Sequence, residues 1–349
     1  MSAVSRHAYL DTRISVLAPR LLDPQTLIGL VDLVTDQQAD VLQRAGLAGA
    51  VAGAAGNVIS LEQSLMAQWL AEAASLARAT TGAGRDLLLE WMRRFELINL
   101  KILLRGRRAR TETAILREDM LNLGAAASLP VEILLRTETV GELLRAMEAT
   151  PYAAMARVAR ALFEEQKDLF TLEAVFDRQY FIGLMQRVQR MPAAERNRLV
   201  PLVGTLADRN NLIWLLRYRF SYGLAAPFVY FLLVPGGLRL HSARLKDLVG
   251  KESVAQVMAS LPAQLAETLE RSDDMGEAEV GMCRVLHNQA LRTLHHARFS
   301  VARAVAYLIL REAQMLAVHI AIKGQWLQLD RDLVRACVRE AAGSAELEG

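Results

Sequence analysis

One helical pattern occurs three times in this chain and constrains its fold more than any other feature. Residues 96–107, read as a helix, place an acid, an Asn, several Leu and an Arg on one face, because positions 0, 3, 4, 7, 8 and 11 of a helix lie together. The same face returns in 208–219, and more loosely in 312–323. Its marked positions are Glu96, Asn99 and Arg107; Asp208, Asn211 and Arg219; and Glu312 and Lys323.

A second landmark, the helix-capping box, repeats in the same order. Thr139 is followed three residues later by Glu, and Ser253 is followed three residues later by Gln. Thr26 lies about one period before Thr139 and is interpreted as a weaker third match. Two independent landmarks at nearly one spacing indicate an internally repeated protein.

The repeats predict an all-α fold of three similar helical lobes. Hydrophobic residues make up 52% of the chain, only nine Pro interrupt it, and no long window alternates like a strand. We predict lobes at 1–115, 116–228 and 229–349, arranged as a pseudo-threefold funnel around a central cavity. The period is too long for the common short solenoid repeats.

The charge and cysteine content exclude several classes of protein. There are 41 Lys and Arg against 38 Asp and Glu, and a net charge of +3 does not by itself imply a nucleic-acid partner. The two cysteines form no CxxC motif, so we predict no disulfide framework and a reducing compartment.

Two long uncharged stretches are candidates for membrane spans. Residues 45–61 are rich in Gly and Ala and only weakly hydrophobic, and 220–238 are interrupted by Pro227 and Pro235. Neither supplies the roughly 20 apolar residues of a spanning helix. The first 13 residues also lack the apolar core of a signal peptide. The sequence therefore predicts no transmembrane segment and a soluble protein that is able to sit at a membrane.

The chain carries no recognisable catalytic or nucleotide motif, and we predict no catalytic, cofactor or metal site. The best metal candidate is Cys283 with His287 on one helical face, followed by His295 and His296. One face supplies two ligands, whereas zinc takes three or four, so packing residues are the favoured interpretation.

The helix that contains the first copy ends in a basic cluster, Arg105, Arg107, Arg108 and Arg110. Such a cluster binds phosphates in some proteins, but no aromatic residues are interleaved with these arginines. A helix C-terminus with solvated charges is favoured, with docking of an acidic protein as a further option. Asn99 and Asn211 are predicted to be buried amides whose hydrogen bonds fix helix packing.

Taken together, these passages resemble the C subunit of the archaeal and bacterial V/A-type rotary ATPases, the counterpart of the eukaryotic d subunit. The resemblance extends nearly end to end. It rests on the paired helices above and on the passages Ala8 to Arg13, Asp177 to Phe181, Pro235 to Leu238 and Tyr307 to Gly324.

The resemblance implies a non-catalytic rotor subunit on the cytoplasmic face of the membrane, holding no nucleotide or ion. Its partners would be the central-stalk subunits D and F, the proteolipid ring of c/K/L-type subunits and, as a further candidate, the large membrane stator subunit. Its socket would transmit torque between the ATPase head and the ring that carries H⁺ or Na⁺. As a hypothesis, Arg105, Arg108, Arg110 and Arg217 line the socket or its rim.

Three alternatives stay open at this point. The first is an all-α scaffold that binds another protein in a soluble complex. The second is a helical metal-dependent enzyme that uses Cys283, His287 and His295 or His296. The third is a basic nucleic-acid module acting through residues 105–110, whose binding would weaken strongly with salt.

Overall fold

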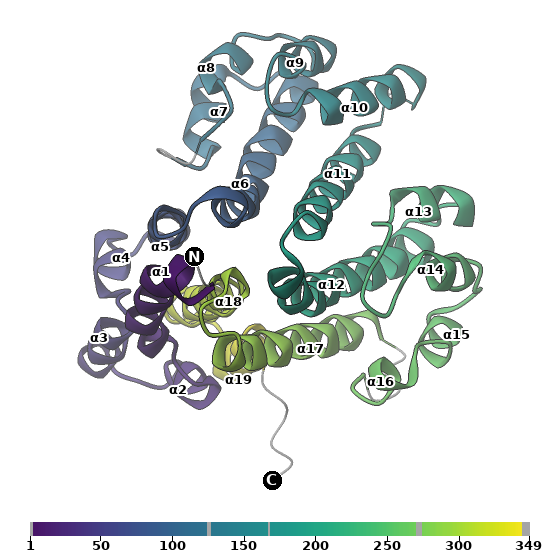
Figure 1. The fold of residues 1–349 in the computed structure, drawn as a ribbon. Coiled ribbons are helices and arrows are strands. Elements are labelled where there is room, and N and C mark those ends of the chain that lie inside the picture. The colour runs from purple at the N-terminus through teal and green to yellow at the C-terminus, as the bar shows by residue number, and fades with distance from the viewer. Residues whose placement is uncertain (1–2, 124–126, 167, 270–273, 344–349) are drawn as a thin grey trace. The chain divides into compact units, whose positions relative to one another are not determined.

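The computed structural model describes residues 3–123, 127–166, 168–269 and 274–343, and every regular element in these ranges is a helix (Figure 1). The predicted all-α class is confirmed. The chain divides into two compact units: unit 1 comprises Met1–Arg85 and Val188–Gly349, and unit 2 comprises Asp86–Arg187. The three predicted lobes and the funnel with its central cavity are not decided by this division and stay predictions.

Unit 2 is built on two long helices from opposite ends of its segment, α6 (Gly82–Ala109) and α11 (Leu169–Gln189). They pack through side chains: the Tyr180 hydroxyl donates to the carbonyl of Trp91 at 3.4 Å, and Arg187 Nε contacts Glu90 Oε2 at 2.6 Å. Four short helices lie between them in the chain: α7 (Thr113–Asp119), α8 (Val131–Leu134), α9 (Val140–Met147) and α10 (Ala153–Gln166).

Unit 1 repeats this order of long, short and long helices. Its long helices α12 (Ala193–Leu216) and α17 (Met275–His296) pack along each other. Between them in the chain lie the π-helical turn η3 (Arg217–Ser221), α13 (Ala226–Leu232), α14 (Ser242–Val249), α15 (Val254–Ala259) and α16 (Ala263–Ala266).

The helix that carries the third copy of the sequence pattern packs against the N-terminal part of the chain. Helix α18 (Val301–Trp326) packs on α5 (Val58–Arg78), and the indole nitrogen of Trp69 donates to the carbonyl of Leu308 at 3.1 Å. Figure 1 shows the purple N-terminal helices beside yellow-green α18 and α19. The remaining elements are α19 (Arg331–Ala341), α1 (Ala3–Leu17), η1 (Ala18–Arg20), α2 (Pro24–Gly29), α3 (Thr35–Arg44) and α4 (Ala48–Gly53).

Helix α18 is also the one described helix that is long and apolar enough to cross a membrane. In its most apolar window 72% of the residues are buried inside the protein, where they pack against α1, α5, α12 and α17. Buried core helices share this length and composition, so we interpret α18 as the core helix of unit 1.

The two predicted capping boxes are confirmed. Thr139 and Ser253 each accept a hydrogen bond from the backbone N–H three residues on, at 3.2 Å, and the side chain of that later residue accepts from the N–H before the cap. The weaker third match is wrong: Asp23 caps α2, and the N–H of Thr26 donates to it at 2.9 Å. Asp23 is the better cap because it directly precedes Pro24 at the first helical position.

Candidate functional site

The most specific polar feature of unit 2 is the carboxylate of Glu96, which is 1% exposed. It accepts hydrogen bonds from the Leu129 N–H at 3.0 Å and the Ser128 hydroxyl at 2.7 Å, and also contacts the Ser128 N–H and the Tyr152 hydroxyl. Burial and the neighbouring carboxylate raise the pKa of Tyr152, so its hydroxyl stays a donor. Glu96 therefore ties the segment before α8 to α6.

Two further residues of α6 bind the backbone of the same region. The Asn99 amide pairs with Leu121, donating to its carbonyl at 2.9 Å and accepting from its N–H at 2.8 Å. Arg107 Nη2 donates to the Leu135 carbonyl at 2.8 Å. We call such a polar trio on a long helix a loop clamp, because each member holds the backbone of the segment beside that helix.

The second clamp has the same design on α12. Asp208 is fully buried and accepts from the N–H groups of Arg239 and Leu240, both at 2.9 Å. Burial raises the pKa of Asp208 to about 6, although these backbone donors oppose the shift. Asn211 pairs with Val234, donating at 3.0 Å and accepting at 2.8 Å.

The second clamp also includes Arg219, and its Asp208 explains why the Pro-Gly-Gly passage contains glycine. Arg219 donates to the carbonyls of Val249 at 3.0 Å and Leu224 at 2.8 Å. A Cβ added to Gly237 would lie 1.9 Å from Asp208 Oδ1. Only glycine therefore allows this loop to approach the buried carboxylate so closely.

The third clamp lies one residue earlier than the repeat pattern indicates. Glu312 and Lys323 are half-buried, whereas Arg311 is fully buried and Gln314 is 2% exposed. Gln314 donates to the Arg20 carbonyl at 3.0 Å and accepts from the Leu22 N–H at 3.0 Å. Gln314 thus plays the part of Asn99 and Asn211 for a segment near the N-terminus.

Arg311 carries a positive charge where the other clamps carry a carboxylate. Its guanidinium donates to Glu72 of α5 at 2.8 Å and 3.0 Å and to the Ala45 carbonyl at 2.9 Å. The Tyr307 hydroxyl also donates to Glu72 at 2.5 Å. Farther along α18, Gln325 accepts from Gln38 at 2.9 Å.

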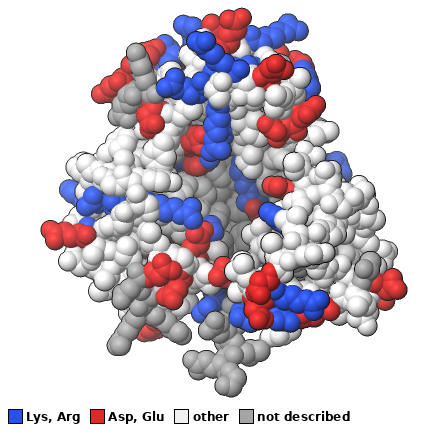
Figure 2. Space-filling model, turned by 180° about the vertical axis from the view of Figure 1, so that it is seen from behind, with Lys and Arg blue, Asp and Glu red and all other residues white. Residues whose placement is uncertain are grey.

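The basic residues predicted at the rim occupy two kinds of environment. Arg105 forms a paired contact with Glu173, at 2.6 Å and 2.5 Å, and Arg217 contacts Glu279 at 2.6 Å. Within the described residues, no hydrogen bond or ion pair involves the side chains of the exposed Arg108 and Arg110. Figure 2 shows Lys and Arg interspersed with Asp and Glu on the face it presents, rather than gathered in one basic field.

The residues weighed as metal ligands do not form a ligand set. No three His, Cys, Asp or Glu side chains lie together in a metal-binding arrangement within the described ranges. The Cys283 sulfur instead accepts from Arg209 Nε at 3.2 Å. His287 and His295 lie along α17 beside a cavity.

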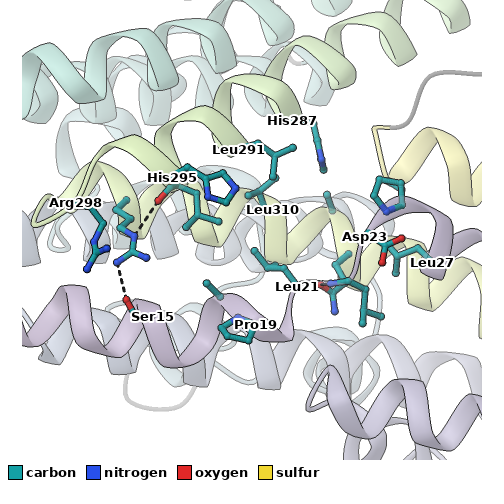
Figure 3. A pocket seen from close by; sticks show the side chains of 18 residues that line it. Ser15, Pro19, Leu21, Asp23, Leu27, His287, Leu291, His295, Arg298 and Leu310 are labelled. Carbon is teal, nitrogen blue, oxygen red and sulfur yellow. Dashed lines mark hydrogen bonds between the residues drawn. The ribbon is translucent and has the colours of Figure 1, made fainter.

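That cavity, about 600 Å³, lies in unit 1 between the α1–η1–α2 segment, α17 and α18 (Figure 3). The sequence did not predict it, because its walls come from opposite ends of the chain. The spacing of Leu291 and His295 on one face of α17 is the signal that the sequence offered, but the facing wall is about 270 residues away.

Comparison with known proteins identifies relatives over most of the chain. The family model described as ATP synthase (C/AC39) subunit matches residues 10–337. A protein of Methanothermobacter thermautotrophicus, named as the C subunit of an A-type ATP synthase, is 25% identical over 273 residues, which are 73% of this chain and 68% of that protein. A protein of the same name from Methanosarcina mazei is 20% identical over 337 residues, 95% of this chain and 92% of its own.

Proposed function

The chain belongs to the ATP synthase (C/AC39) subunit family, and from this membership we propose that it is the non-catalytic central-stalk subunit of a V/A-type rotary ATPase. In this proposal it is a peripheral protein on the cytoplasmic face of the membrane. It links the stalk subunits D and F to the proteolipid ring and passes torque between them. The large membrane stator subunit is a further candidate contact.

The observation that carries the proposal is the loop clamp, present three times in a member of this family. In a protein that transmits torque, the long helices and the segments beside them must not move relative to one another. Buried side chains that hold backbone groups through paired hydrogen bonds supply such stiffness. Asn99, Asn211 and Gln314 each make this contact with a different segment.

The proposal is tested by purifying the tagged full-length chain from its own detergent-solubilised membranes and identifying its partners by mass spectrometry. Recovery of the stalk subunits and the proteolipid ring is expected. Recovery of neither, with the chain wholly in the soluble fraction, would leave the all-α scaffold as the better account.

The proposed rim is tested by charge reversal. Arg108 and Arg110 are exposed, so replacing both with Glu leaves the fold intact and is expected to weaken stalk binding by about tenfold or more. Arg145→Glu is the matched control, since Arg145 is an exposed arginine of the same unit that is outside the proposed rim. Unchanged stalk binding by the double variant would remove these residues from the rim.

A further inference from the structure

We propose that the cavity between the α1–η1–α2 segment, α17 and α18 binds a small amphiphile with one apolar chain and one negatively charged head group, a carboxylate or a phosphate. This proposal does not depend on the rotary role. The cavity volume of about 600 Å³ falls within the range of roughly 300–1,000 Å³ typical of small-molecule sites.

The body of the cavity is apolar. Leu291 on α17 and Leu310 on α18 line it on one side, and Leu21 and Leu27 line it from the N-terminal segment (Figure 3). Side chains of this kind bury an alkyl chain favourably, because apolar surface leaves water. The lining therefore fits a hydrocarbon chain better than a polar metabolite.

One end of the cavity carries a surplus positive charge. Asp11 is 3% exposed and is shared by two arginines, Arg303 Nη1 at 2.5 Å and Arg298 Nε at 2.9 Å. Neither arginine pairs with a second carboxylate within the described part of the chain. Two positive charges face one negative charge, so one monoanion would balance this end.

Of these two arginines, Arg298 is the one available to a ligand. Arg303 is 8% exposed and also donates to the Leu294 carbonyl and the Ser15 hydroxyl, both at 3.0 Å. The Arg298 side chain is 58% exposed, and no described residue accepts from its two terminal nitrogens. His295, three residues earlier and exposed, lines the same end.

The opposite end repels a negative head group. Asp23 accepts from the hydroxyl and the N–H of Thr26, at 2.7 Å and 2.9 Å, and these hydrogen bonds lower the pKa of its carboxyl group. Burial lowers the pKa of the nearby His287, so its ring is neutral at pH 7. The ligand is therefore oriented with its head at Arg298 and its chain toward Leu27.

The proposal is tested by calorimetric titration of the full chain with decanoate, below its micelle concentration. One decanoate is expected to bind per chain. Decanol, which lacks the charge, is expected to bind at least about tenfold more weakly than decanoate, because a hydrogen bond to a charged group is lost. The affinity for decyl phosphate, compared with that for decanoate, shows which of the two head groups the cavity prefers. Equal binding of decanoate and decanol would overturn the proposal.

Two variants locate the ligand. Ala313 lines the cavity and is half-buried, so Ala313→Phe fills the space and is expected to abolish decanoate binding without touching an arginine. Arg298→Gln is expected to weaken decanoate about tenfold and to leave decanol unchanged. Arg335→Gln, which removes a paired arginine outside the cavity, is the matched control. Unchanged decanoate binding by folded Ala313→Phe would place the ligand elsewhere and refute the site.

Discussion

The first members of the second and third clamps, Asp208 and Arg311, hold neighbouring segments with opposite charges. In the second, the Asp208 carboxylate accepts from two backbone N–H groups and needs no counter-ion. In the third, the Arg311 guanidinium donates to a backbone carbonyl and to the carboxylate of Glu72. An ionised carboxylate can hold only segments that present N–H groups, and a guanidinium holds only acceptors.

This contrast shows that the repeated positions share a structural role, which is to hold a neighbouring segment, and do not share a residue type. A buried guanidinium also needs a buried partner, which α5 supplies as Glu72. The third clamp therefore joins α18, the Ala45 backbone and α5, whereas the second joins α12 and η3 to segments that follow them in the chain, from Leu224 to Val249. Three measurements compare the two clamps, and a fourth compares the two capping boxes.

The largest effect is expected from separating the buried ion pair of the third clamp. Arg311→Met removes the closest cation from the Glu72 carboxylate and leaves, among the described residues, only Arg20, 3.9 Å away, so the free energy of unfolding should fall by about 3–5 kcal/mol in chemical denaturation. The double variant Arg311→Met, Glu72→Gln should recover part of this loss. A double variant no more stable than Arg311→Met would mean that the charge pairing is not the source of the effect.

The second clamp is broken by Asn211→Leu, which removes an uncharged amide. The N–H and carbonyl of Val234 then lose their partner in a buried place, at a cost of about 2–4 kcal/mol. The adjacent Asn210→Ala is the control, because Asn210 is half-buried and makes only a 3.4 Å contact with Arg209. Equal losses in the free energy of unfolding for the two variants would mean that the clamp adds no specific stability.

A third measurement follows the carboxylate of the second clamp by pH. The folded-state pKa of Asp208, about 6, lies above its unfolded value, so native protein retains a proton that unfolded protein releases. Stability from this group is present at low pH and is lost as pH rises from about 4 to about 6, by roughly 1–3 kcal/mol. Asp208→Asn should remove that slope in unfolding curves across this range. An identical slope in the variant would assign it to other groups.

The smallest effects are expected at the capping boxes. Thr139→Ala in unit 2 and Ser253→Ala in unit 1 each delete one side-chain acceptor for a helical N–H, and each should cost about 1 kcal/mol. Matching losses in thermal unfolding would support equivalent roles in the two repeats. Replacement by Asp instead of Ala should restore stability, since Asp is an equally good cap; failure to restore it would point to another cause.

Much of this architecture could be predicted because acid, Asn and Arg recur at one spacing in the first two copies. Periodicity alone places Glu96 and Asp208 at equivalent positions on the marked faces of their two helices. The third clamp could not be found in this way, because Arg311 and Gln314 differ in charge and register from the pattern. The cavity could not be predicted for a related reason, because periodicity describes one helix and not the distant segment that faces it.

The packing of α18 against the N-terminal helices also sets an order in time. Leu22 leaves the ribosome 292 residues before its partner Gln314. At about 5–20 residues per second, the N-terminal helices wait roughly 15–60 s for α18. A nascent chain cut off before α18 therefore presents an unfinished N-terminus that chaperones and proteases can recognise.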